Sequence, residues 1–224
     1  MNRDEKRDRS ATLSPAIVET ESHRAVFPRE PTGGTWISVN DVGVCLALIN
    51  WHRIERNPKN NILSRGLVVR ELVGQSTADE VAASLKRLPL RNLRPFRLIV
   101  ISPDDRRVTE WRWNLERLTR RNHKWQRQHW FSSGFDENRA EVERAKICVS
   151  ASVNATGCSL KRLRRLHRSH APERGPFSIC MHRADAATVS YTEVSVTENS
   201  ASMRYASGPP CTARCTVTKK LPIA

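Results

Sequence analysis

The sequence of 224 residues lacks an apolar run long enough to cross a membrane, and no apolar segment of the secretory type stands at its start. These absences argue against a membrane-spanning protein and favour the reducing cytoplasm as its location. Internal repeats and low-complexity tracts are absent too, and the hydrophobic fraction of 38% is typical of a globular protein. We therefore expect a folded cytoplasmic protein without a membrane span.

A regular cysteine framework is also missing. The six cysteines, at positions 45, 148, 158, 180, 211 and 215, include no CxxC pair, and Cys45 and Cys180 lie in apolar runs where a thiol behaves as a small hydrophobe. One set that could bind a metal is His167, His170, Cys180 and His182. Its spacings, HxxH followed by CxH, match no common zinc module. The sequence therefore predicts no metal ligand and no cofactor.

Acidic residues are scarce relative to basic ones. Asp and Glu number 23 against 38 Lys and Arg, of which 30 are Arg, so the net charge is +15. Such a balance suits either a polyanionic partner or a solvated surface of mixed charge. The sequence contains no zinc finger, homeodomain or RNA-recognition motif, and the basic stretch LKRLRRLHRSH would spread its charge around a helix. We expect no specific nucleic-acid partner.

The length suits a single domain over residues 1–224. Residues 1–32 are polar and interrupted by prolines, which predicts a loop with at most a short extended piece. After this loop, two apolar runs separated by the turn residues NDVG predict a hairpin that ends at Asn50.

Helical and extended segments then alternate in groups. Apolar spacing predicts a helix within residues 64–75, and Thr77 and Glu80 form a capping box at the start of the next one. Further helices are expected at 136–152 and 159–169, and further strands at 96–102, at 108–114, in segments ending near Arg121 and Phe131, and at 177–183, 188–196 and 202–206. This order favours an α+β protein built as a four-layer αββα sandwich of mainly antiparallel sheets.

Several motifs occur in a specific order over nearly the whole chain. They are NRDE at 2–5, GGTW at 33–36, NDVGVCLALIN at 40–50, RPFRLIVIS at 94–102, FSSGFDENRAEVERAK at 131–146 and GPFSICMHRADAATVSYTEV at 175–194. In this combination the chain resembles the NRDE family, which includes the transport and Golgi organisation protein 2. Through that family it resembles the N-terminal-nucleophile hydrolases of the choloylglycine hydrolase and penicillin acylase branch.

The resemblance implies a particular nucleophile. Members of the family usually start with Met-Cys, followed by a first strand that leads into the NRDE motif, whereas here Met1 directly precedes that motif. We therefore expect Met1 to be an internal methionine and the first strand to be missing. An N-terminal nucleophile needs its thiol and its basic α-amino group on one residue. Removal of Met1 would expose Asn2, so we expect the printed chain to be catalytically silent.

The resemblance also assigns supporting residues. Asp4 matches the carboxylate that holds the amino group of the nucleophile, with Arg3 beside it as a charge partner, and Asn50 matches an amide of the oxyanion hole. Ser133 stands where related hydrolases carry a second asparagine, and we expect Ser133 and Trp36 at the substrate site.

The residues themselves leave plainer roles open. Arg3 and Asp4 could form an ordinary exposed ion pair, and Asn50 could cap the end of a strand. Trp36 could belong to the core, together with the tryptophans at 111 and 113.

Two functions follow from the resemblance. The first is hydrolysis of a small acyl-amide or acyl-thioester by the complete form of the protein. The alternative is a non-catalytic module that binds lipid or haem or acts in trafficking, with Cys180 and His182 as conceivable haem ligands. Either function implies a small acyl-containing or apolar ligand, and neither indicates an oligomeric state.

Overall fold

The computed structural model describes residues 1–151, 159–214 and 216–224, so Cys158, Cys215 and the last residue of the helix expected at 136–152 lie outside the described residues. The chain divides into two compact units. Unit 1 contains residues 1–9, 127–193 and 205–216, and unit 2 contains residues 10–126, 194–204 and 217–224. The expectation of one domain over residues 1–224 stays a prediction.

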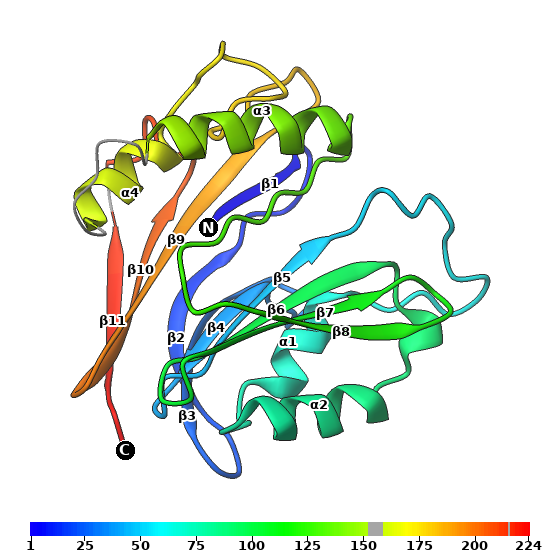
Figure 1. Cartoon of the computed structure of the whole chain (residues 1–224), viewed down its shortest axis with the longest axis vertical. Coiled ribbons are helices and arrows are strands. Elements are labelled where there is room, and N and C mark those ends of the chain that lie inside the picture. The colour runs from blue at the N-terminus through cyan, green and yellow to red at the C-terminus, as the bar shows by residue number, and fades with distance from the viewer. Residues whose placement is uncertain (152–158, 215) are drawn as a thin grey trace. The chain divides into compact units, whose positions relative to one another are not determined.

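Unit 2 contains a seven-stranded sheet in which neighbouring strands follow each other along the chain and run antiparallel (Figure 1). Its strands are β2 (Leu13–Glu19), β3 (Arg24–Arg29), β4 (Ile37–Asn40), β5 (Cys45–Asn50), β6 (Phe96–Ser102), β7 (Arg107–Trp113) and β8 (Leu118–His123). Such a meander needs only short connections between most of its strands.

The hairpin expected before Asn50 is confirmed as β4 and β5. Gly43 has a φ of 78°, which the turn requires and which other residues rarely adopt. The buried Asn40 side chain accepts a hydrogen bond from the backbone N–H of Val44 at 2.9 Å and donates to the carbonyl of Gln75 at 2.9 Å. Asn40 therefore fixes the turn and also joins it to the segment after the first helix.

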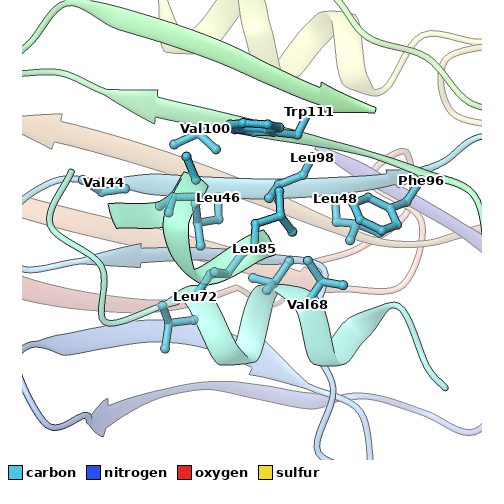
Figure 2. Close-up of a cluster of buried hydrophobic side chains, with 14 of the residues drawn as sticks. Val44, Leu46, Leu48, Val68, Leu72, Leu85, Phe96, Leu98, Val100 and Trp111 are labelled. Carbon is cyan, nitrogen blue, oxygen red and sulfur yellow. The ribbon is translucent and has the colours of Figure 1, made fainter. Parts of the chain in front are cut away.

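Helices α1 (Gly66–Leu72) and α2 (Ala78–Arg87) cover one face of this sheet, as Figure 1 shows. Leu72 and Leu85 of these helices are fully buried against sheet residues such as Leu46 and Leu98 (Figure 2). Trp36, Trp111 and Trp113 are all less than 10% exposed. The plainer expectation for these tryptophans, a place among the buried residues, is therefore confirmed.

The capping box of α2 is confirmed with one change. The Thr77 hydroxyl accepts a hydrogen bond from the Glu80 backbone N–H at 3.1 Å, but the Glu80 carboxylate accepts from the N–H of Ser76 at 2.8 Å and not from that of Thr77.

We expect Thr77→Ala to lower the free energy of unfolding by about 1 kcal/mol, because an N–H of the first turn loses its acceptor. Ser159→Ala is the matched control, since Ser159 precedes α4 without a side-chain cap. Equal effects of the two changes in urea unfolding would contradict this role of Thr77.

Unit 1 contains β1 (Asn2–Lys6), α3 (Glu137–Ser150), α4 (Leu160–His167) and parts of β9 (Ala186–Thr197) and β10 (Ser200–Ser207). These strands belong to a four-stranded sheet with the order β1-β9-β10-β11, whose last strand is β11 (Val217–Pro222). β1 pairs antiparallel with β9, and a bulge lies between Arg3 and Asp4. The α+β class is thus confirmed, and the four-layer arrangement stays a prediction.

The expectation that residues 1–32 form a loop is wrong, because β1, β2 and β3 all lie there. Pro28 is accommodated inside β3, and the polar β1 is stabilised by its pairing with β9. The strands expected near Phe131 and at 177–183 are wrong as well: the first segment has no strand, and the second makes only an isolated bridge between His182 and Ala187.

Helix α3 buries an arginine and leaves two of its valines exposed. Val142 and Val149 are 54% and 62% exposed, whereas Ala140, Arg144 and Cys148 are buried. Arg144 is buried because its guanidinium has specific partners, which are described below. None of the helices in the described part of the chain is long and apolar enough to cross a membrane.

Candidate functional site

Asp4 forms the centre of a polar site in unit 1. Its register partner on β9 is Thr188, whose hydroxyl donates a hydrogen bond to Asp4 Oδ1 at 2.6 Å. Asp4 Oδ2 lies 3.5 Å from Nη2 of Arg144. The Asp4 side chain is 24% exposed and the Arg144 side chain 6%, so the carboxylate lies at the edge of the buried region.

Burial raises the pKa of Asp4, and the positive charge of Arg144 and the hydrogen bond from Thr188 compensate for this only in part. The surroundings of Asp4 therefore favour its neutral form more than water does. A further cation that approached its exposed side would favour ionisation.

Arg144 connects this carboxylate to two loops of the same unit. Its guanidinium donates to the carbonyl oxygens of Ser132 at 3.1 Å and Pro176 at 3.2 Å. The first loop belongs to the FSSG motif, and the second precedes the conspicuous ICMHR segment. Asp4, the FSSG loop and Arg144 are therefore brought together, and no local pattern in the sequence pointed to Arg144.

Arg3 is buried and pairs with Glu5 at 3.0 Å on the same strand. The charge pair of Arg3 with Asp4 stays a prediction. Alternate residues of a strand share a face, which explains why Arg3 meets Glu5. Ser133 is half-buried and accepts a hydrogen bond from the Phe135 N–H at 3.3 Å, which stabilises its loop.

Asn50 and Trp36 belong to unit 2. Asn50 is the last residue of β5, pairs with Phe96 and is half-buried. By alternation it shares a strand face with Leu46 and Leu48, which belong to the core beneath the helices. Trp36 is 7% exposed, as a core residue would be. Roles of Asn50 in an oxyanion hole and of Trp36 in substrate binding stay predictions.

The described cysteines of the interior are poor nucleophiles. Burial raises the pKa of Cys45 and of Cys180 to about 12 and that of Cys148 to about 11. A thiol reacts as the thiolate, which is scarce at neutral pH for such groups.

A second cluster in unit 1 consists of His170, Cys180, His182 and Cys211. One ligand atom of each side chain lies within 4.8 Å of those of the other three. Of the set considered from the sequence, His167 lies elsewhere, where Nδ1 is 3.1 Å from Oδ1 of Asn2. The fourth member of the cluster is instead Cys211, which follows β10 in the sequence. The spacing between Cys211 and the other three residues does not predict that they meet.

Backbone hydrogen bonds fix the segments that carry this cluster. The Cys180 N–H donates to the Ser169 carbonyl at 3.0 Å, and the His182 N–H donates to that of Gly175 at 3.2 Å. Cys180 is fully buried, and the other three members are half-buried. Burial, together with the charge of Arg174, lowers the pKa of His182, so its ring is neutral near pH 7.

A buried charge network lies in the sheet of unit 2. The fully buried Glu110 accepts hydrogen bonds from Arg97 at 2.6 Å and Arg112 at 2.9 Å, and its Oε2 lies 2.9 Å from Nε2 of His123. Burial alone would raise the pKa of Glu110, but these hydrogen bonds hold it at about 2. Its partners satisfy the carboxylate, so we assign this network to stability.

Comparison with known proteins adds the family. Residues 1–171 match the sequence profile of the family described as Transport and Golgi organisation 2. This range includes Asp4 and Arg144 and ends before Cys180. No curated protein matches the chain. Because the matched residues make up most of the 224, the chain belongs to the Transport and Golgi organisation 2 family.

Proposed function

We propose that the chain carries the supporting residues of a cysteine N-terminal-nucleophile hydrolase that acts on a small acyl-amide or acyl-thioester. The four-layer αββα arrangement would be its scaffold. The observation that supports this most is the Asp4 carboxylate, which is held by Thr188 and Arg144 while its side chain stays 24% exposed. Membership of the family, whose profile covers the NRDE motif, is consistent with it.

The proposed chemistry requires a cation beside Asp4. The α-amino group of an N-terminal cysteine has an ordinary pKa of about 8, so it exchanges a proton readily near neutral pH and can serve as the base for its own thiol. Asp4 would orient this amino group and stabilise its protonated form once it has accepted the thiol proton.

Arg144 has a positioning role in this scheme. It contacts Asp4 and also the carbonyl of Ser132, so it would keep the carboxylate and the FSSG loop in one geometry. Arg3, which the family resemblance places at the site, would act on β1 through its pair with Glu5.

The test compares the 224-residue chain with a longer version, in which a strand that begins Met-Cys precedes Met1. The substrates are a panel of short acyl-amides and acyl-thioesters, and the readout is release of the free acid. We expect hydrolysis only from the version with the terminal cysteine, because thiol and amine must belong to one residue. In that version Asp4→Asn should lower kcat by about 100-fold.

Asp8→Asn is the matched control, because Asp8 is an exposed aspartate just beyond β1. Labelling of the terminal cysteine with iodoacetamide reports its reactivity separately from turnover. Hydrolysis by the printed sequence, or equal activity of the Asp4→Asn and Asp8→Asn proteins, would contradict the proposal.

A further inference from the structure

We propose that His170, Cys180, His182 and Cys211 bind one Zn²⁺ ion in a closed, structural site. All four belong to unit 1 and come from three separate segments of the chain. This site is independent of the proposed hydrolase chemistry, and three of its four members lie beyond the residues that match the family.

The distances agree with tetrahedral coordination. With Zn–N near 2.05 Å and Zn–S near 2.3 Å, the edges of a zinc tetrahedron are about 3.3 Å between two nitrogens and about 3.6 Å between nitrogen and sulfur. Nε2 of His182 lies 3.2 Å from Nε2 of His170, 3.6 Å from Sγ of Cys180 and 3.5 Å from Sγ of Cys211. The three edges that meet at Nε2 of His182 match their expected values closely.

Hydrogen bonds explain the three short distances to Nε2 of His182 less well than a bound metal ion does. A ring nitrogen offers either one N–H or one lone pair, so Nε2 of His182 can satisfy only one of its three neighbours. A shared cation satisfies all of them at once, because each ligand atom of a tetrahedron lies near the three others.

The ligand set also fits zinc in charge and number. Two thiolates balance the charge of Zn²⁺, and two neutral imidazoles complete a Cys₂His₂ site without an open position. Binding would release the two thiol protons to solvent. Haem fits less well, since its porphyrin occupies four positions in a plane and four protein ligands that converge on one point leave no room for it.

The position in the fold indicates a structural purpose. The segment from Gly175 to Arg183 is buried over much of its length but contains no helix and only one bridge residue. A zinc ion would join this segment to the end of α4 through His170 and to the turn after β10 through Cys211. Such a link stabilises a region that has little secondary structure of its own.

The experiment measures the zinc content of the purified protein by inductively coupled plasma mass spectrometry. We expect about one Zn²⁺ per chain. His182→Ala and Cys211→Ser should each lower the affinity for zinc at least about tenfold, since each removes one ligand. After removal of zinc, Co²⁺ should give the visible absorption of a tetrahedral thiolate site, and Cys211→Ser should weaken its thiolate band.

Cys148→Ala and His167→Ala are the matched controls, because both residues belong to unit 1 but not to the cluster. If a variant fails to fold, the unaltered chain still provides the test, since added Zn²⁺ should raise its midpoint of thermal unfolding after chelation. Absence of a cobalt spectrum, an unchanged midpoint with zinc, or a disulfide between Cys180 and Cys211 in the purified protein would each overturn the proposal.

Discussion

Glu110→Gln should lower the free energy of unfolding by about 3 to 5 kcal/mol at pH 7, because it leaves the buried Arg97 and the partly buried Arg112 without their counter-charge. Arg97 and Arg112 lie directly opposite each other on β6 and β7, and Glu110 contacts both of them. The glutamine amide would direct its NH₂ group at one of these cations. Denaturant unfolding followed by circular dichroism measures the effect.

The matched control is Glu116→Gln. Glu116 pairs with Arg56 at 2.7 Å, but both side chains are more than half exposed, so the change should cost less than about 1 kcal/mol. Similar losses of unfolding free energy in the Glu110→Gln and Glu116→Gln proteins would show that the burial of Glu110 adds little to the effect of its substitution.

The same carboxylate should make stability depend on pH. The pKa of Glu110 is about 2 in the folded protein against an ordinary value of 4.5. Its contribution to the free energy of unfolding is therefore complete above pH 4.5 and is lost as the pH falls toward 2. The unaltered chain should therefore lose on the order of 3 kcal/mol between about pH 5 and pH 2 through this group. The Glu110→Gln protein should lack that part of the acid sensitivity, and parallel pH profiles of the two proteins would contradict it.

Leu98→Ala should cost about 2 to 5 kcal/mol, the range for a large buried aliphatic side chain whose cavity cannot fully collapse. Leu98 is 0% exposed in the middle of β6 and lies between the helices and Trp111 in the core shown in Figure 2. Urea unfolding should show a lower midpoint with an unchanged slope.

Leu13→Ala serves as its control, because Leu13 is a strand residue of the same type that is 51% exposed. We expect this change to stay within about 0.5 kcal/mol. A loss at Leu13 as large as that at Leu98 would mean that strand propensity, and not burial, dominates both results.

Local signals in the sequence predicted local structure well. The NDVG turn, the Thr77 cap and the apolar strand before Ser102 depend on neighbouring residues, and all three are present. By contrast, β1 is a strand because of β9, whose Thr188 is 184 residues from Asp4. A polar segment with such a distant partner carries no alternation that could reveal it.

The Asp4 site and the histidine–cysteine cluster likewise each contain residues that a local sequence pattern marks and residues that it does not. Asp4 could be singled out from the NRDE motif, but its partner Arg144 lies on a helix face that looks polar and therefore solvent-exposed. Cys180 and His182 are close in sequence, whereas Cys211 follows His182 by 29 residues with a strand pair between them. Only the folded chain shows which cysteine joins them.

The pairing of β1 with β9 has a consequence for synthesis on the ribosome. During synthesis β1 must wait for a partner strand whose Thr188 lies 184 residues after Asp4, and unit 1 also needs residues 205–216. An apolar strand left unpaired for so long would invite aggregation with other nascent chains. The charged residues Arg3, Asp4, Glu5 and Lys6 would keep this unpaired segment hydrated until β9 has been made.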